Sequence, residues 1–334
     1  MKILILSHSF FPFIGGIEVV SEMFCRSFTE AGHEIHLVTW TKDPENTLFP
    51  FQVTRQPNMV QLFRLHAWAD VVVENNPALR LSWPAVFFNR PSVIVIQTWI
   101  ARMDGTVVFQ DKLKLKWLKR STKVVAISES IRKACFPAAE VIGNPFRANQ
   151  FSILSNVTRE KDYVFLGRLV SDKGVDLAIK AIAGLGERCV LTIIGDGPEA
   201  NTLKQLTIDL RVEDQVVFKG PLRGSELVKC LNEHRFMLIP STWEEPFGIV
   251  ALEGIACGCI PIVSDGGGLA DAVGSAGVKF KRGDVKSLIE CMTHISGNPQ
   301  LESKLKDAAI PHLTNYRPEI IIKRYLDILN SIYK

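Results

Sequence analysis

Short apolar runs alternate with amphipathic stretches through almost the whole chain. In the first half, the runs KILIL, EIHLVTW, ADVVVEN, SVIVIQ and KVVAIS are apolar at successive positions rather than at every second one. This pattern is typical of strands that are buried on both faces of a parallel sheet. The stretch IEVVSEMFCRSFTEAG between the first two runs has helical spacing and stops at Gly32. Strands and helices in this alternation predict an α/β fold with a parallel sheet covered on both faces.

The alternation breaks near residue 143 and then starts again. The segment GNPFRANQFSILSNVTREKD is polar and weakly periodic, as expected of a linker. After it, YVFLG, CVLTIIG, QVVFKG, FMLIPS, CIPIVS and GVKF predict a second set of strands. We therefore expect two Rossmann-like, doubly wound domains at 1–145 and 161–316, joined by a linker at 146–160. Residues 317–334 are expected to form one amphipathic helix with Pro318 in its first turn.

Composition and charge exclude several classes of protein. No apolar run approaches the roughly 18 residues of a membrane span, and the N-terminal MKILILSHSF is too short in its apolar part for a signal peptide. The seven cysteines are scattered, which predicts a reducing cytoplasm and no metal site. A net charge of +4 is too small to indicate nucleic-acid binding. Residues 1–150 carry the excess, with 17 Lys and Arg against 12 Asp and Glu.

Glycines follow the first strand, at the sheet edge where ligands bind in open parallel sheets. Gly15 and Gly16 directly precede the first long helix, so backbone N–H groups there can approach an anion. A flexible turn is the alternative. No G-x-G-x-x-G follows this strand, which argues against a dinucleotide site. The later GDGPEA, residues 195–200, fits that spacing but places Asp196 and Glu199 where a pyrophosphate would lie.

Two cationic side chains follow the first strand of the second domain, in FLGRLVSDKG. Arg168 comes directly after the strand, and Lys173 stands at a predicted helix start. A lysine at a helix N-terminus is unfavourable against the helix dipole, which indicates a nearby anion. A guanidinium fork and a compact ammonium together favour a diphosphate site. A solvated surface lysine is the alternative.

Two glutamates bracket the apolar stretch EEPFGIVALE, residues 244–253. Glu245 lies in the loop after the strand FMLIPS, and we expect the next helix to begin near Phe247 with Gly248 close to a ligand. Glu253 has apolar or small helical neighbours, so it is expected to point inward. The two hydroxyl groups of a ribose suit an inward carboxylate. The alternatives are a salt bridge to a neighbouring helix for Glu253 and an exposed loop acid for Glu245.

The motifs IGGIE, GRLVSDKG, IGDGPEANTLKQL, VVFKGPL and PSTWEEPFGIVALEGIACGCIPIVSDGGGLADAV, in this order, resemble the retaining GT-B glycosyltransferases of family GT4. The likeness covers nearly the whole chain and is strongest from 160 to 280. It implies two Rossmann-like domains that face each other across a cleft, with the C-terminal helix packing back on the first, acceptor-binding domain. It also implies a nucleotide-sugar donor held mostly by the second domain, without a metal or another cofactor. The absence of a D-x-D pair agrees.

The resemblance also implies roles for particular residues. Glu253 would bind the ribose hydroxyls and Glu245 would lie near the donor sugar. Arg168 and Lys173 would neutralise the departing diphosphate. The nucleotide base is expected near Leu222. Further donor contacts are implied for residues of both domains: Gly15, Gly16, Asn144, and the backbone N–H groups of Phe247, Gly248 and Ile249.

The implied activity is metal-independent transfer of a sugar to a hydroxyl of a glycan or lipid-linked acceptor, with retention at the anomeric carbon. The donor is expected to be a UDP-sugar, and a GDP-sugar is the alternative. A nucleotide-sugar epimerase and a non-catalytic nucleotide- or glycan-binding protein are the alternatives. Many members of the family have a histidine after the fourth strand of the first domain, but VIVIQTWIARMDG has none. Gln97, Thr98 or Trp99 takes that place, and His8 is a further candidate for assisting the acceptor.

A basic segment, 111–123, is the last feature. It is expected to place lysines on one helical face beside two large apolar side chains: Lys112, Lys116, Lys119, Lys123, Leu113 and Trp117. Such a helix suits an anionic lipid surface, which agrees with the lipid-linked acceptors of the resembled family. A solvated helix face beside core leucines is the alternative. The expected location is the cytoplasm, with peripheral contact at the inner face of the membrane.

Overall fold

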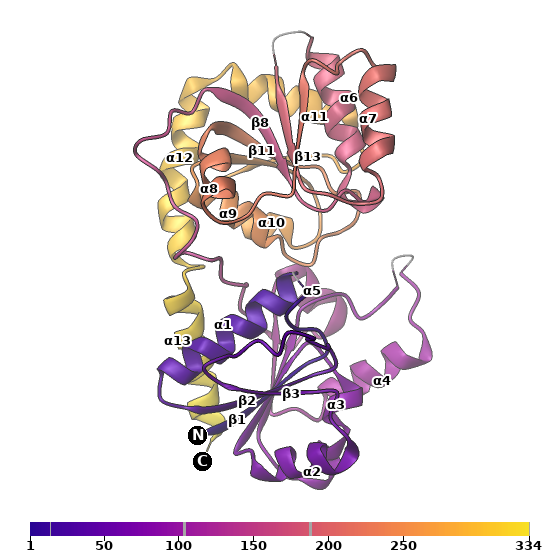
Figure 1. Ribbon diagram of the computed structural model, residues 1–334, viewed down its shortest axis with the longest axis vertical. Helices are drawn as coiled ribbons and strands as arrows, with labels where there is room; N and C mark the ends of the chain where they lie inside the picture. The colour runs from indigo at the N-terminus through magenta and orange to yellow at the C-terminus, as the bar shows by residue number, and fades with distance from the viewer. Residues whose placement is uncertain (14, 103–104, 187–188, 334) are drawn as a thin grey trace. The chain divides into compact units, whose positions relative to one another are not determined.

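The computed structural model describes residues 1–13, 15–102, 105–186 and 189–333, and these form two compact units (Figure 1). One unit holds Met1–Pro145 together with Pro318–Lys334, and the other holds Phe146–Arg317. Each contains one parallel sheet with helices packed on both faces. The prediction of two Rossmann-like, doubly wound domains is therefore confirmed. Residues 146–160, expected to be a linker, contain no helix or strand and are part of the second unit.

The sheet of the first unit has seven parallel strands in the order β3-β2-β1-β4-β5-β6-β7. Their bounds are β1 (Lys2–Ser7), β2 (Glu34–Thr39), β3 (Gln52–Arg55), β4 (Val71–Asn75), β5 (Ser92–Ile96), β6 (Lys123–Ala126) and β7 (Glu140–Val141). Five of these strands are the apolar runs of the sequence. The sequence pattern missed β3 and β7 because they are short edge strands without a buried apolar run.

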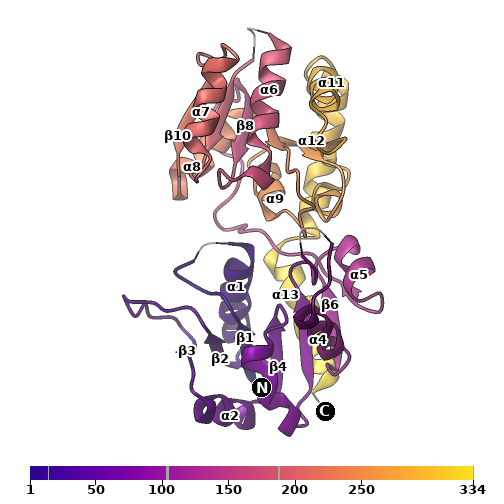
Figure 2. The same cartoon turned by 90° about the vertical axis from the view of Figure 1, so that its right-hand side faces the viewer.

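Helices cover both faces of this sheet (Figure 2). They are α1 (Gly16–Glu30), α2 (Met59–Trp68), α3 (Leu79–Ser82), the 3-10 helix η1 (Trp83–Phe87), α4 (Phe109–Leu118), α5 (Glu129–Cys135) and α13 (Pro318–Ile332). Leu62 of α2 and Leu81 of α3 pack in one cluster with Leu4 of β1. The end of the chain belongs to this unit because α13 lies beside α1, where the rings of Tyr325 and Phe24 are 4.6 Å apart.

The sheet of the second unit has six parallel strands in the order β10-β9-β8-β11-β12-β13. Their bounds are β8 (Lys161–Leu166), β9 (Leu191–Ile194), β10 (Val216–Gly220), β11 (His234–Ile239), β12 (Ile260–Ser264) and β13 (Val278–Phe280). All six coincide with apolar runs. The four inner strands are largely buried, as expected for a sheet covered on both faces, whereas the edge strands β10 and β13 are only partly buried.

The second unit carries helices on the two faces of its sheet. They are the 3-10 turn η2 (Ser171–Lys173), α6 (Val175–Leu185), α7 (Ala200–Asp209), α8 (Gly224–Asn232), α9 (Ile249–Ala256), α10 (Leu269–Val273), α11 (Val285–Ser296) and α12 (Pro299–Thr314). Phe236 and Leu238 of β11 pack in a cluster with α6, α7 and α11. Met237 between them points to the opposite face and meets α9, where a Cβ at Gly254 would come within 2.5 Å of its sulfur.

Each sheet has one topological switch point, where strands that follow in sequence are added to the other side. In the first unit it lies between β1 and β4, and in the second between β8 and β11. The loops that leave these strands at their carboxyl ends diverge, and ligands of open α/β sheets bind in the space beside them.

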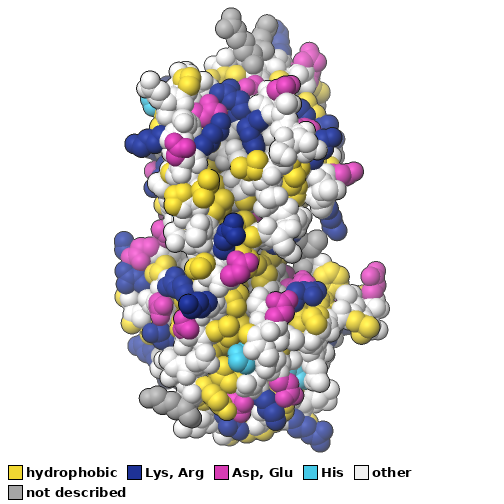
Figure 3. All heavy atoms as spheres, turned by 90° about the vertical axis from the view of Figure 1, so that its left-hand side faces the viewer, with side chains coloured by type: hydrophobic (Ala, Val, Ile, Leu, Met, Phe, Trp, Pro, Cys, Tyr) yellow, Lys and Arg dark blue, Asp and Glu magenta, His cyan; other side chains and the backbone are white. Residues whose placement is uncertain are grey.

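The helices in the described parts of the chain include none that is both long enough and apolar enough to cross a bilayer. On the face drawn in Figure 3, basic side chains lie among acidic ones in both units. The small positive net charge is therefore not gathered into one large patch on that face.

Candidate functional site

The loops after β8 and β11 pack backbone against backbone at the switch point of the second sheet. The N–H groups of Thr242 and Trp243 donate to the carbonyl oxygen of Asp172, at 3.0 and 3.4 Å. Gly174 ends the first loop at φ +65°, and a Cβ there would lie 2.0 Å from the carbonyl oxygen of Pro240. The two loops can approach this closely because position 174 has no side chain.

Lys173 and Glu245 meet across these loops. The Lys173 ammonium lies 2.5 Å from Oε1 of Glu245, and the Ser241 hydroxyl donates to the same oxygen at 2.8 Å. The ion pair joins residues that are 72 positions apart in the sequence. Lys173 belongs to the 3-10 turn η2 and not to a helix start, since α6 begins at Val175. The predicted lysine and glutamate thus lie together at the carboxyl edge of the sheet.

Arg168 provides a second positive charge at this edge. It follows β8 directly and its side chain is exposed. Within the described chain, no carboxylate lies close enough to Arg168 to form an ion pair. Its guanidinium is therefore available to an anion from solution.

Glu253 lies on α9 and points inward, as its apolar helical neighbours indicated. It is 5% exposed, and the Nε and Nη2 atoms of Arg147 both lie 2.9 Å from its Oε1. Burial raises the pKa of Glu253, and the Arg147 guanidinium opposes that shift. The partner is a cation of the 146–160 segment and not of a neighbouring helix. No described residue donates a hydrogen bond to Oε2, so that oxygen can accept one from a ligand.

The N-terminus of α9 lies just beyond Glu245. The helix begins at Ile249 rather than near Phe247, whose ring is buried beside Tyr316 at 5.6 Å. Gly248 is the N-cap at φ +116°, and no side chain caps the helix. The N–H groups of Phe247, Gly248 and Ile249 have no acceptor among the residues that the structure describes. Three backbone donors are therefore left at a positive helix end.

The loop after β12 holds the Glu245 loop from its other side. Gly268 donates its N–H to the carbonyl oxygen of Glu245 at 2.7 Å, and a Cβ at Gly268 would lie 2.1 Å from the carbonyl oxygen of Pro246. The Glu245 loop is thus fixed between its neighbours. Sequence reasoning missed Gly268, Ser241 and Arg147 as parts of this site. The glycine run SDGGG after a strand was a usable signal for the first of them, but nothing local marked the other two.

The remaining predicted contacts lie elsewhere in each unit. Gly15 is the N-cap of α1, and the Glu18 carboxylate lies beside it, 2.6 Å from where a Cβ of Gly15 would be. The helix end at Gly15 and Gly16 therefore already has an acid close by. Leu222 is half-buried in the loop after β10. His8 is exposed after β1.

Asn144 belongs to a buried chain of hydrogen bonds in the first unit. Its amide donates to Gln97 at 2.7 Å, and Gln97 donates to Asn75 at 2.8 Å. Asn75 donates to Ser21 at 2.7 Å, and Ser21 donates to Ser7 at 2.9 Å. The side-chain amides of Asn144 and Gln97 thus bind each other in the buried region beyond the carboxyl ends of the strands. Gln97, one of the three candidates for the place of the family's histidine, therefore has a structural partner, while Thr98 and Trp99 are half-buried beyond it.

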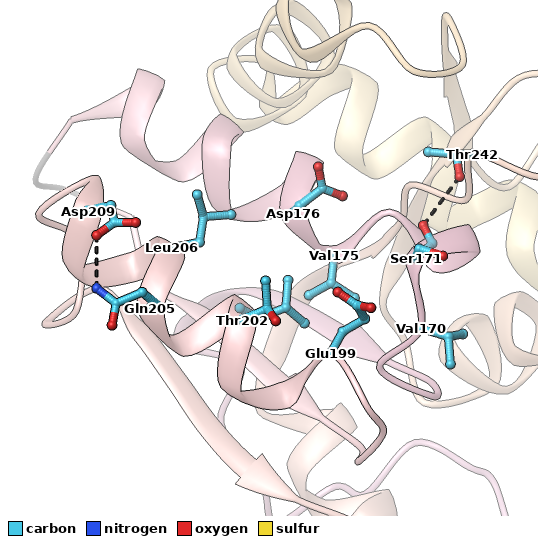
Figure 4. Close-up of a pocket in the computed structure, with 11 residues that line it drawn as sticks. Val170, Ser171, Val175, Asp176, Glu199, Thr202, Gln205, Leu206, Asp209 and Thr242 are labelled. Carbon is cyan, nitrogen blue, oxygen red and sulfur yellow. Dashed lines mark hydrogen bonds between the residues drawn. The ribbon is translucent and has the colours of Figure 1, made fainter.

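A groove of about 530 Å³ opens along α6 and α7 in the second unit (Figure 4). Its lining includes the carboxylates of Asp176, Glu199 and Asp209 and no lysine or arginine. Gln205 donates to Asp209 at 2.9 Å, and Thr242 closes the end at Ser171. None of the predicted site residues lines it. This acidic groove does not suit a diphosphate, which agrees with the argument from Glu199 against a phosphate site at 195–200.

The basic segment differs from its prediction. Helix α4 ends at Leu118, where turn hydrogen bonds from Arg120 and Ser121 stop it, and Lys123 is the first residue of β6. The expectation of four lysines on one helical face is therefore wrong, because the apolar run after Lys123 pairs with β5. Trp117 does not face solvent with the lysines, since its indole N–H donates to the buried Glu74 at 2.7 Å.

Comparison with known proteins finds a family that the second unit resembles. Residues 146–311 match the model of the family described as Glycosyl transferases group 1. An uncharacterized glycosyltransferase of Methanocaldococcus jannaschii is 40% identical over 116 residues, which are 34% of this chain and 30% of that protein. A glycogen synthase of Mycobacterium tuberculosis is 33% identical over 163 residues, 47% of this chain and 39% of that protein. The chain thus matches well under half of the length of either relative.

Solved structures share the architecture of the whole chain. HepE of Anabaena, crystallised with UDP and glucose, aligns with a TM-score of 0.83 over 99% of this chain and 100% of its own, at 20% identity. The sucrose-phosphate synthase of Thermosynechococcus elongatus aligns with a TM-score of 0.81 over 99% of both chains, at 18% identity. These likenesses confirm the predicted GT-B fold class.

Proposed function

Because residues 146–311 match the model of the glycosyl transferases group 1 family, we propose that this protein is an enzyme that transfers a sugar from a nucleotide-sugar to a hydroxyl of an acceptor. The observation that carries the proposal is the meeting of Lys173 and Glu245 at the switch point of the second sheet, near Arg168, which has no ion-pair partner among the described residues. An ion pair that only stabilises the surface can form anywhere on the protein and need not lie at the carboxyl edge of the sheet. Here two cations gather at the edge where ligands bind, together with three N–H groups that have no acceptor in the described part of the chain.

The chemistry explains why cations are needed there. During transfer the bond between the anomeric carbon and the diphosphate breaks, a bond to the acceptor oxygen forms, and the proton of the acceptor hydroxyl passes to the departing diphosphate. Positive character develops on the sugar and negative charge on the departing diphosphate. Arg168 and Lys173 would stabilise that charge without a metal ion. Glu245 holds Lys173 before the donor arrives and would then lie near the sugar.

Glu253 is proposed to bind the ribose. Its Oε1 is occupied by Arg147, whose charge opposes the rise in pKa that burial causes. Its Oε2 is free of protein donors in the described chain and can accept from the ribose hydroxyls. This division leaves one carboxylate oxygen for a ligand while Arg147 holds the other.

We propose UDP as the nucleotide, a glycan or lipid-linked hydroxyl as the acceptor, and retention at the anomeric carbon. The UDP and UDP-glucose complexes of HepE, which has this fold, support the choice of nucleotide. NMR of the product tests retention, since an inverted linkage would reject it.

Peripheral contact with an anionic membrane, from the cytoplasm, is also part of the proposal. Phe109 and Leu113 of α4 are 73% and 41% exposed, and Lys112 and Lys116 alternate with them along the helix. Vesicles with anionic lipid should therefore bind the wild-type protein and not the double variant Lys112→Glu, Lys116→Glu. Equal binding of both would reject this contact.

Two measurements test the activity. Thermal-shift titration with UDP, GDP and ADP should show stabilisation that is largest for UDP, because a ligand that binds only the folded state stabilises it. Incubation with radiolabelled nucleotide-sugars should then yield a glycosylated product. Isomerised donor would instead indicate an epimerase. Binding without turnover would indicate a non-catalytic protein, and no binding of any nucleotide would reject the proposal.

A further inference from the structure

Arg80 and Trp40 form a stacked pair at the switch point of the first sheet. Arg80 lies in α3, which follows β4, and Trp40 follows β2. The backbone N–H of Trp40 donates at 3.1 Å to the carbonyl oxygen of His8, which follows β1. The segments that leave three neighbouring strands therefore meet here, at the sheet edge where open α/β sheets bind ligands.

The guanidinium of Arg80 lies over the ring of Trp40. Its Cζ lies 3.6 Å from the centroid of the Trp40 ring, which is a close cation–π contact. Trp40 itself packs against the hydrophobic cluster beneath α2 and α3, so the ring gives a firm support. Stacking covers one face of the guanidinium and leaves its in-plane N–H groups to donate outward.

The charge of Arg80 has no counter-ion in the described part of the protein. Arg80 is exposed and forms no ion pair there. Arg55 at the same edge provides a contrast. It donates to the carbonyl oxygens of Phe11 and Thr41 and pairs with Asp43 at 3.2 Å. The donors of Arg55 hold loops together, whereas those of Arg80 are open to a ligand.

Acids around this edge do not neutralise Arg80. Asp43 is turned inward to Arg55. Glu74, at the end of β4, is buried and accepts from Trp117 and from the N–H of Ala78. Glu45 is exposed in the loop after β2 but makes no ion pair with Arg80. The exposed charge that faces a ligand at the stacked pair is therefore the positive one.

We infer that Arg80, held on Trp40, binds an anionic group of the acceptor, so that the acceptor carries a phosphate or a carboxylate. The inference rests on the proposed glycosyl transfer, in which the second unit holds the donor. A planar guanidinium with two parallel N–H groups matches the two oxygens of either anion, and a pre-oriented fork loses little freedom on binding. A neutral sugar offers no group that needs this charge.

The test uses the full chain saturated with UDP, so that phosphate groups in the donor site are already supplied. The dissociation constants of glucose 6-phosphate, glucuronate, dodecyl phosphate and glucose are measured by ligand-observed NMR. The anionic probes should bind more tightly than glucose, and the three anions distinguish a sugar phosphate, a carboxylate and a lipid phosphate. Arg80→Gln should weaken the bound anion by roughly ten- to hundredfold, the loss expected for a charge-assisted bidentate contact.

Two further variants make the result specific. Arg80→Lys keeps the charge and loses the fork, so its affinity should lie between those of wild type and Arg80→Gln. Arg64→Gln removes an exposed arginine of α2 and should change nothing. Equal affinity of the anionic probes for wild type and Arg80→Gln, or no binding of any anionic probe, would overturn the inference. If the wild type does not bind UDP, the proposed function is rejected instead. The anion affinities of the wild type and Arg80→Gln can still be compared without UDP.

Discussion

Single residues decide whether the second unit can hold a nucleotide, and a substitution of Glu253 gives the most direct test. Glu253→Gln should lower UDP affinity about tenfold, because the amide loses the charge that strengthens its hydrogen bonds to the ribose. It also leaves Arg147 without its counter-ion. Isothermal titration with UDP measures the loss, with Glu213→Gln, an exposed acid of the same unit, as the matched control. Unchanged affinity in Glu253→Gln would separate this residue from the ribose.

Glu74 makes the stability of the first unit depend on pH. Burial raises its pKa to about 7, although Trp117 and Ala78 donate hydrogen bonds to it. The unfolded chain loses this proton near the ordinary value of 4.5, so the stabilisation is complete below that pH and is lost as pH rises through 7. Between pH 5.5 and 8 the wild type should lose about 2 kcal/mol that Glu74→Gln does not lose. Urea unfolding at both pH values, followed by tryptophan fluorescence, checks this. Parallel pH dependences of the two proteins would contradict it.

At the scale of loops and helices, the close approach of the β8 and β11 loops depends on one glycine. Gly174→Ala puts a methyl group 2.0 Å from the carbonyl oxygen of Pro240, so the loops must separate. Gly186→Ala is the matched control, since φ is +81° there and no atom lies within 4 Å of the new Cβ. The control should cost about 1 kcal/mol from its backbone conformation alone. Gly174→Ala should cost more and also weaken UDP binding, because Lys173 and Glu245 move apart. Equal effects in thermal unfolding and UDP titration would show that the contact does not matter.

The elements that the sequence predicted are those whose signal is local. The central strands were predicted because burial on both faces leaves successive apolar residues, and the edge strand Gln52–Arg55 was missed because it has none. The positions of Lys173 and Glu245 beyond strand ends could be predicted, but not their ion pair, which depends on the order of strands in the sheet. Arg147 was not predicted, because the segment around it has no periodicity and the acid it binds is 106 residues away.

At the scale of the molecule, the return of α13 makes the stability of the first unit depend on the end of the chain. Tyr325 is buried against Phe24, and Tyr325→Ala should destabilise the first unit by about 3–5 kcal/mol, the usual loss for a large buried ring. Tyr333→Ala, at a position 46% exposed, should change stability by less than about 0.5 kcal/mol. Because the proposed nucleotide contacts at Lys173, Glu245 and Glu253 lie in the second unit, UDP affinity below the melting temperature should be the same in both variants. Calorimetry of Tyr325→Ala with and without UDP should show two unfolding transitions. The first should occur at a lower temperature than in the wild type and should not shift with UDP, and UDP should raise the temperature of the second. A single transition that carries both changes would mean that the two units unfold together, and that the donor site depends on the helix packed against Phe24.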